Sequence, residues 1–373
     1  MTGTAPAGPP GARYALSVIH PGSPVLRVRY RQGVLITPHG YPDWPLCARA
    51  VLELPPPPPG LTRHEVRVVD VLAANLTMAR AAAEPDGDPL WPARPAPAAP
   101  PPAADPAGPR SLAEPAVSTP AGWCWAHVAM TREIALVPIE LHGAFRHGGG
   151  LSTVAVAGSG VRSDEPAAAV PLAGAEAVPE ELLTLLEQAL GRPLPVAYRR
   201  FLAATNGAGP AGPAVLPGHG FLADQQLFGI ARTDRHQDLS YLVDWLRDRL
   251  TVDFLPIGYV QGGLLAVRIA GGDLDSVWYL DDDDPRDRDD LDADHICANL
   301  LTRCADSVED LCARLVEPPR TLRAMAQHQV DQGQLRELRD DQIGAGLPAR
   351  MKAPWQPPDR VGRDALAALF EAR

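Results

Sequence analysis

The stretch AGWCWAHVAMTREIALVPIELHGAFRHGGGLST, residues 121–153, decides how the first half of this chain is interpreted. Residues 123–128 are apolar enough to form a strand, and residues 139–145, directly after Pro138, are predicted to form a short helix. The glycines at 148–150 then let the chain turn back. The stretch therefore predicts a compact unit in which a strand, a short helix and a glycine turn lie close together.

Three histidines occupy defined places in this unit. His127 lies on the predicted strand, His142 on the predicted helix, and His147 just past the end of that helix. Hydrolysis of a phosphodiester needs an activated water and a cation beside the leaving oxygen. Histidines on a strand and around a short helix can supply both a base and metal ligands, so the spacing favours a small metal-dependent nuclease site.

These residues also resemble the WHH branch of the HNH nuclease superfamily, whose members occur as toxin domains in bacterial polymorphic toxin systems. The pattern of that family runs roughly GYTWHHH, then LVP, then LH, then H-x-GG. The matching residues here are Trp125, His127, Leu136, Val137, Pro138, Leu141, His142, His147 and Gly149, with Thr119, Pro120 and Gly122 upstream. The resemblance extends to Gly40, Tyr41, Pro42, Asp43, Trp44, Asp70, Ala74 and Asn75, and covers about residues 24–155.

The resemblance implies a role for each histidine. His127 would be the general base that polarises water, and His142 and His147 would be ligands of a divalent metal ion, zinc or magnesium. Ala126 stands where the family carries a further histidine, although a hydrolytic zinc site normally uses three protein ligands. Two interpretations stay open: an endonuclease in which water or Asp43 replaces the missing ligand, and a nuclease-like domain that keeps the fold without the activity.

The second half is predicted to consist of helices followed by an antiparallel meander. Amphipathic patterns predict helices at 179–190, 194–205, 238–250 and 306–316, and strand-like runs lie at 254–260, 263–270 and 276–283. Tyr198, Phe201 and Leu202 share one face of the second helix, which Asn206-Gly207 ends with a turn. Helices, then a meander, then a closing helix are typical of an α+β fold.

This half resembles the SUKH (Smi/Knr-like) superfamily, which includes fungal cell-wall regulators and many bacterial immunity proteins. The matching residues are Leu194, Pro195, Tyr198, Phe201, Leu202, Asn206, Gly207, Leu255, Pro256, Ile257, Gly258, Val277, Trp278 and Tyr279. The resemblance covers about residues 178–317 and implies a binding fold rather than an enzyme. No nucleophile–base spacing stands out in this half.

Acidic residues are concentrated in the second half. Residues 178–317 contain 12 Arg against 24 Asp and Glu, whereas residues 24–158 contain 11 of each. The net charge of −11 argues against a protein whose whole surface follows nucleic acid. The densest acidic segment comprises Asp281, Asp282, Asp283, Asp284, Asp287, Asp289 and Asp290. It is either a solvated loop or a partner-binding surface that meets a basic nuclease and blocks its phosphate path.

The rest of the chain completes a two-domain α+β prediction. In the first half, residues 25–36 predict a hairpin, residues 70–83 predict a helix, and the prolines at 55–59 exclude strand interior. The predicted organisation is a disordered N-terminus at 1–23, an HNH-like ββα-metal domain at 24–157 with a Pro/Ala-rich insertion at 85–118, a linker at 158–177, a SUKH-type domain at 178–317, and a polar tail at 318–373 with weak helices at 320–340 and 363–371.

Two functions are compatible with these features. The first is a toxin–immunity type protein, in which a metal-dependent endonuclease domain that acts on nucleic acid is fused to a SUKH domain. The second is a non-catalytic immunity or binding protein, in which the nuclease-like domain is degenerate and the acidic domain neutralises a nuclease toxin. The five scattered cysteines, the absence of a membrane-spanning run and the absence of a signal-peptide pattern favour a cytoplasmic protein without a membrane partner.

Overall fold

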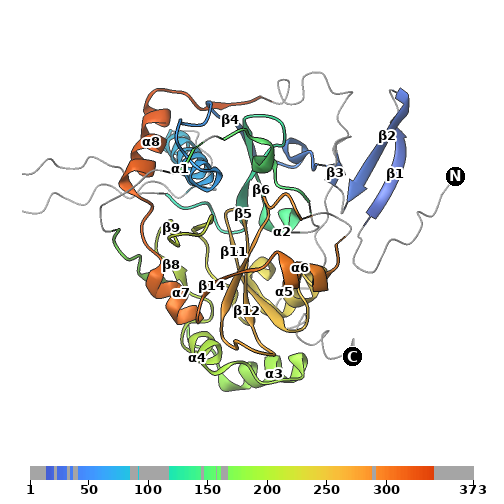
Figure 1. The fold of residues 1–373 in the computed structure, drawn as a ribbon, viewed down its shortest axis with the longest axis vertical. Helices are drawn as coiled ribbons and strands as arrows, with labels where there is room; N and C mark the ends of the chain where they lie inside the picture. The colour runs from blue at the N-terminus through green and yellow to red at the C-terminus, as the bar shows by residue number, and fades with distance from the viewer. Residues whose placement is uncertain are drawn as a thin grey trace, which may run out of the picture.

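The computed structural model describes residues 14–20, 23–31, 34–36, 41–84, 91, 117–143, 147–156, 158–160, 167–287 and 291–339. Most of the predicted insertion, the weak helix predicted at 363–371, and Asp289 and Asp290 lie outside these residues. Within them, we call residues 41–160 together with 320–338 the N-terminal half, and residues 167–316 the C-terminal half. Figure 1 shows how the two halves are stacked.

The N-terminal half is built on a four-stranded antiparallel sheet in the order β15-β4-β6-β5. The strands are β4 (Ala50–Glu53), β5 (Trp123–His127), β6 (Glu133–Pro138) and β15 (Arg336–Glu337), and the short helix α2 (Ile139–His142) follows β6. The strand and the short helix predicted around the histidines are therefore confirmed, with α2 ending before residue 145. Strands β1 (Tyr14–His20), β2 (Ser23–Arg31) and β3 (Val34–Ile36) form a separate three-stranded sheet. The predicted hairpin at 25–36 corresponds to β2 and β3.

Helix α1 (Arg63–Ala82) begins seven residues before the position expected from the sequence. Its start is fixed by a capping box, in which the side chain of Thr62 accepts from the backbone of Glu65 and the carboxylate of Glu65 accepts from the backbone of Thr62. The valine-rich run at 66–71 looks like a strand by composition, but it lies in this helix and is buried. Tertiary packing therefore outweighs local strand propensity here.

The two faces of the N-terminal sheet are covered by different parts of the chain. Ile134 and Leu136 of β6 pack toward α1, while the alternating residues Ala135 and Val137 belong to the core of the C-terminal half. On β5, Ala126 also belongs to that shared core. The two halves are thus joined by a continuous apolar core and not only by a linker.

The C-terminal half is an antiparallel meander covered by helices. Strands β11 (Phe254–Val260), β12 (Gly263–Arg268), β13 (Val277–Asp281) and β14 (Thr302–Ala305) pair in sequence order. Helices α3 (Glu180–Leu190), α4 (Val196–Thr205), α5 (Leu239–Trp245), α6 (Ala293–Asn299) and α7 (Val308–Arg314) surround it, with short strands β7 (Leu172–Ala173), β8 (Gly209–Pro210), β9 (Ala214–Val215) and β10 (Leu222–Ala223). The predicted meander is confirmed, and α3 ends at Gly191 with a positive φ of 69°, as its sequence indicates. The α+β class is confirmed.

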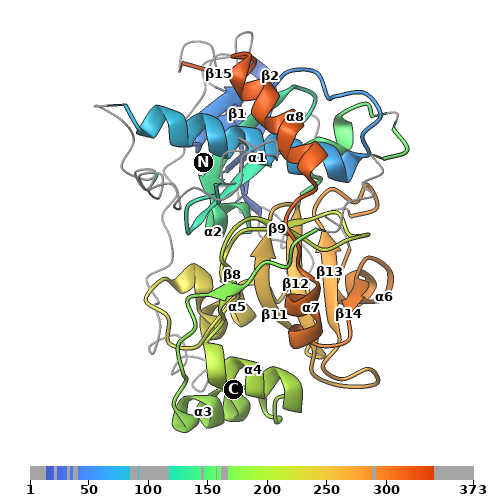
Figure 2. The same ribbon diagram turned by 90° about the vertical axis from the view of Figure 1, so that its left-hand side faces the viewer.

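The segment after residue 318 returns to the N-terminal half. Helix α8 (Arg320–Asp331) packs against α1, and Leu322 and Ala326 are buried in the core that α1 shares with the sheet. Strand β15 then pairs with β4, with Arg336 opposite Glu53. Figure 2 shows α8 crossing α1 at one end of the molecule, with α3 and α4 at the other end. Part of the predicted polar tail therefore completes the N-terminal half.

No helix among the described residues has the length and apolar character needed to cross a membrane.

Candidate functional site

His127 is held by a buried carboxylate from α1. Its Nε2 atom lies 3.0 Å from Oδ2 of Asp70, whose side chain is fully buried. Arg132 donates to both oxygens of the same carboxylate, at 3.0 Å each. A carboxylate that holds one ring nitrogen of a histidine fixes the orientation of the ring. The end of β5 therefore presents His127 in a defined orientation.

The other two histidines form an aromatic cluster with Trp44. The ring of His142 stacks on Trp44 at a centroid distance of 5.1 Å, and His147 meets His142 edge-on at 4.8 Å. Trp44 belongs to the short 3-10 helix η1 (Trp44–Leu46), upstream of α1. The structure therefore brings together His142 and His147, as the sequence predicts. It also shows that the ring of Trp44 contacts both of them.

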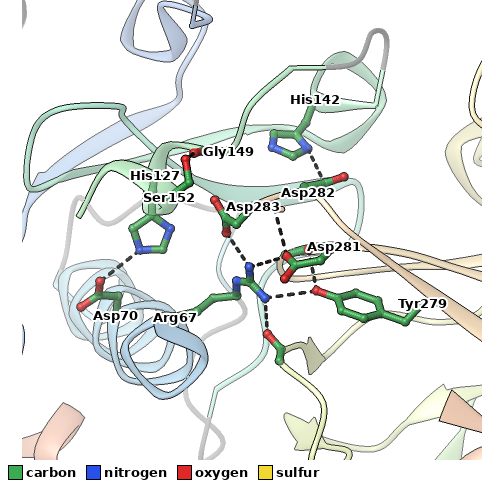
Figure 3. A network of polar contacts seen from close by, with 12 residues as sticks. Arg67, Asp70, His127, His142, Gly149, Ser152, Tyr279, Asp281, Asp282 and Asp283 are labelled. Atoms are coloured by element: carbon green, nitrogen blue, oxygen red, sulfur yellow. Dashed lines mark hydrogen bonds and ion pairs between the residues drawn. The ribbon is translucent and has the colours of Figure 1, made fainter. Parts of the chain in front are cut away.

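An acidic segment at the end of β13, residues 281–284, reaches this cluster from the C-terminal half, and we call it the acidic turn. Figure 3 shows Asp283 between His127 and His142, with Arg67 of α1 pointing at the same carboxylate. Nη2 of Arg67 donates to Asp283 at 2.5 Å and to Asp281 at 2.7 Å. For Asp281, Asp282 and Asp283, the interpretation as a solvated loop is therefore wrong, because these residues contact the N-terminal half of their own chain.

Gly149 is needed for this close approach. Its backbone N–H donates to the carbonyl of Asp282 at 2.9 Å. A Cβ atom at position 149 would lie 2.0 Å from Oδ1 of Asp283, which is far inside van der Waals contact. Gly149 thus makes room for the carboxylate of Asp283.

The remaining acidic residues are arranged differently. Asp284 pairs with the exposed side chain of Arg286, on the same turn. Asp287 is buried. Only the first three residues of the acidic segment are placed against the histidines and Arg67 by the interactions described above.

Side chains from the C-terminal half also hold the elements that carry the histidines. On α2, Glu140 accepts from Tyr241 at 2.5 Å and from Arg235 at 3.1 Å. At β5, the backbone N–H of Trp125 donates to Gln261 at 3.1 Å, and Gln225 donates to the carbonyl of Trp123 at 3.1 Å. These two glutamines pair with backbone groups along the open edge of β5, so the C-terminal half fixes both α2 and β5.

A buried polar network continues this interface toward α1. Asn75 accepts from the indole N–H of Trp125 at 2.7 Å and donates to Thr119 at 3.2 Å. The carboxylate of Asp224, in the C-terminal half, accepts from the backbone of Thr119 at 2.9 Å and from Gln261 at 3.1 Å. Asn75 and Thr119 thus serve as interface residues.

Sequence reasoning missed Arg67 and the two glutamines. The signal for Arg67 was a single arginine inside a valine-rich run. A buried arginine is rare unless an oppositely charged partner neutralises it, so such a residue indicates a buried ion pair. Neither Gln225 nor Gln261 has any distinguishing local pattern. Their importance comes only from the strand edge that the folded chain places beside them.

Burial shifts the pKa values of the groups in this cluster in opposite directions. Burial, together with the nearby Arg249, lowers the pKa of His142 to about 4, although Asp283 opposes the shift. Burial raises the pKa of Asp282 to about 7, against the effect of Arg249. Burial also acts to raise the pKa of Asp283, but Arg67, His127 and His142 outweigh it, so this pKa lies below its ordinary value. Asp283 is therefore ionised at neutral pH.

The donor set does not fit the metal that the sequence predicts. His142 and His147 are adjacent, and Oδ2 of Asp282 lies 3.8 Å from Nδ1 of His142. Yet no group of three His, Cys, Asp or Glu residues in the described part of the chain is arranged to hold a metal ion. Ala126, in the place of the third ligand, is 4% exposed and packs in the shared core. A zinc or magnesium ion would have to be held by fewer protein ligands than a hydrolytic site normally uses.

Comparison with known families agrees with the two-part organisation. Residues 115–157 match the WHH family, described as a nuclease of the HNH/ENDO VII superfamily with conserved WHH. Residues 177–314 match the SMI1/KNR4 family (SUKH-1). The chain therefore combines a WHH nuclease-type domain with a SUKH domain, and we refer to its halves below as the WHH half and the SUKH half. No curated protein matches the chain. Within the matched segment, residues 125–127 read Trp-Ala-His.

The opposed pKa shifts predict an unusual pH dependence of stability. Since the pKa of His142 falls from 6.5 to about 4 on folding, its contribution to the free energy of unfolding rises with pH in this range. Since the pKa of Asp282 rises from 3.8 to about 7, its contribution falls as pH increases through that range. Each slope is at most about 1.4 kcal/mol per pH unit, so the two nearly cancel between pH 4 and 6.5.

Urea unfolding between pH 4 and 7 checks this prediction. Relative to wild type, the stability of His142→Gln should fall with rising pH, because only the Asp282 contribution remains. The stability of Asp282→Asn should instead rise with pH. Equal slopes in all three proteins would show that the two groups do not titrate as the structure implies.

Proposed function

We propose that this protein is a toxin–immunity type fusion in which the SUKH half acts as an inhibitor in cis of the nuclease-type half. The observation that carries the proposal is the position of Asp283. This carboxylate comes from the SUKH half and lies between His127 and His142 of the WHH half, where it is bound by Arg67. An immunity-type domain that fills the site of a nuclease-type domain blocks access of a phosphodiester by charge and by volume.

The geometry favours inhibition in cis over capture of a foreign toxin through the acidic segment. The carboxylates of Asp281 and Asp283 are already bound to Arg67 of their own chain, and the carboxylate of Asp282 faces His142 at 3.8 Å. An outside partner would have to break these contacts before it could use the same carboxylates. The acidic segment is therefore proposed to serve the WHH half of this chain.

We also propose that the protein does not cut nucleic acid while the acidic turn lies in the site. Two features support this: the acidic turn fills the site, and Ala126 removes one of the three expected metal ligands. Substituting histidine at position 126 would place a polar ring in a site that is 4% exposed, and overpacking of this kind costs about 1–3 kcal/mol. The packing of the core around position 126 therefore favours alanine over the missing metal-ligand histidine.

A second candidate is a latent endonuclease that becomes active when the acidic turn leaves. The pair formed by His127 and Asp70 favours it, because a histidine oriented by a buried carboxylate can act as a general base. In this candidate, nucleic acid is the substrate, and a divalent ion would have to be held by His142, His147 and water without a third protein ligand among the described residues.

A plasmid-nicking assay on the full chain tests the proposal and separates the two candidates. Wild-type protein with magnesium, manganese, zinc or nickel is expected to leave supercoiled plasmid intact. The variant Asp281→Ala/Asp283→Ala, which removes both carboxylates from Arg67, tests the second candidate. Nicking by this variant alone, lost again on addition of His127→Ala, would support a latent nuclease. Metal-dependent nicking by the wild-type chain would refute inhibition in cis.

A further inference from the structure

Arg67 is a cation of the WHH half that the SUKH half neutralises. It lies on α1, its side chain is 2% exposed, and its acceptors are Asp281, Asp283, the Tyr279 hydroxyl and the Gly220 carbonyl. All four acceptors belong to the other half of the molecule. Its Nε atom is buried and finds no acceptor among the described residues. The carboxylates of the turn therefore leave one donor of the guanidinium unused.

Three basic groups converge on the carboxylate of Asp283. Besides Arg67, His127 and His142 lie close enough to lower its pKa, and each comes from a different element of the WHH half. Gly149, from the same half, lets the oxygen Oδ1 approach the backbone. A single anionic group is thus surrounded by one arginine, two histidines and a glycine backbone.

We propose that Arg67, His127 and His142 form a binding site for a nucleic-acid backbone phosphate, and that Asp283, assisted by Asp281, occupies it as an intramolecular competitor. This inference rests on the proposed function and assigns the regulation of that site. Arginine binds carboxylate and phosphate with the same donor geometry, so each can replace the other. A phosphate carries more acceptor oxygens than a carboxylate, so it can also engage the unused Nε donor of Arg67.

The acidic turn can leave this site without separating the two halves. Among the described residues, the hydrogen bonds and ion pairs between this turn and the WHH half are the two ion pairs to Arg67, the contact of Asp282 with His142, and the backbone hydrogen bond to Gly149. The contacts of Glu140, Gln225 and Gln261 lie elsewhere on the interface. Exchange of the turn for a phosphate therefore requires a local movement after β13.

Binding of a fluorescently labelled DNA duplex to the full chain in EDTA tests the proposal. The variant Asp281→Ala/Asp283→Ala is expected to bind at least about tenfold more tightly than wild type, with an affinity that falls steeply as salt increases. The matched control is Asp284→Ala/Asp306→Ala, which removes two charges whose ion pairs, among the described residues, are with arginines of the SUKH half. The control should bind like wild type, and Arg67→Gln added to the first variant should abolish its gain.

The Tm in the presence of inorganic phosphate provides a second test, which applies even if Asp281→Ala/Asp283→Ala is less stable than wild type. Because Arg67 then lacks its carboxylates, inorganic phosphate should raise the Tm of Asp281→Ala/Asp283→Ala in a concentration-dependent way, and leave that of wild type nearly unchanged. Equal gains in duplex binding by the control would mean that bulk charge alone is responsible and would overturn the proposal. Unchanged duplex binding together with no phosphate effect on Tm would also overturn it.

Duplex binding and plasmid nicking test different claims, so failure of the phosphate-site proposal can be distinguished from failure of the proposed function. Binding in EDTA does not require a metal or cleavage, so the phosphate site can exist in a protein that never cuts. Conversely, a wild-type chain that nicks plasmid would refute inhibition in cis, whatever the variant binds in EDTA.

Discussion

Replacing Arg67 by alanine is expected to lower the free energy of unfolding by about 3–5 kcal/mol, the usual cost of removing one partner of a buried ion pair. Asp283 is 8% exposed and Asp281 is 22% exposed, so both carboxylates would remain in the interface without their cation. The Tyr279 hydroxyl and the Gly220 carbonyl would lose a donor as well. Urea unfolding of the full chain at pH 7 measures this loss.

Arg80 provides the matched control on the same helix. It pairs with Asp331 of α8, but both side chains are largely solvated, at 37% and 48% exposure. Arg80→Ala should therefore change stability much less than Arg67→Ala, because solvent screens an exposed pair. Similar losses in the two variants would contradict the buried, interdomain role of Arg67.

The second large effect is expected at Leu322, which lies after the residues that match the SUKH family. Its side chain is 3% exposed and packs in the core beneath α1. Leu322→Ala should cost about 2–5 kcal/mol, as other large-to-small core substitutions do. Because α8 packs on α1, hydrogen exchange should become faster in α1 and β4 of the WHH half.

His328→Ala, on the exposed side of the same helix, is the control for this experiment. It should leave both stability and exchange near wild-type values. If Leu322→Ala accelerated exchange only within the SUKH half, the assignment of α8 to the WHH half would be wrong.

Elements with strong local signals could be predicted from the sequence. The helix α3 has an amphipathic stripe ended by Gly191, and the meander β11–β13 consists of short apolar runs separated by turns. The strand and short helix around His127 and His142 also follow from local pattern and proline placement. In each case the deciding information lies within a few residues of the element itself.

The contacts that create the candidate site could not be predicted in the same way. Arg67 and Asp281 are separated by 214 positions, and a run of aspartates is equally compatible with a solvated loop. The same holds for α8, because an amphipathic helix indicates a buried face but not the surface that covers it. Ala126 could be identified as a departure from the family pattern, but its packing against the SUKH half required the fold.

The central claim is that a carboxylate of the SUKH half is bound in the site of the WHH half, and a double-mutant cycle between Arg67 and Asp283 tests it most directly. The cycle compares the unfolding free energies of wild type, Arg67→Met, Asp283→Asn and the double variant. The contact between Nη2 and Oδ2 predicts a coupling energy of about 1.5 kcal/mol or more. Additive effects within about 0.5 kcal/mol would contradict the claim, because that is the behaviour of residues that do not touch.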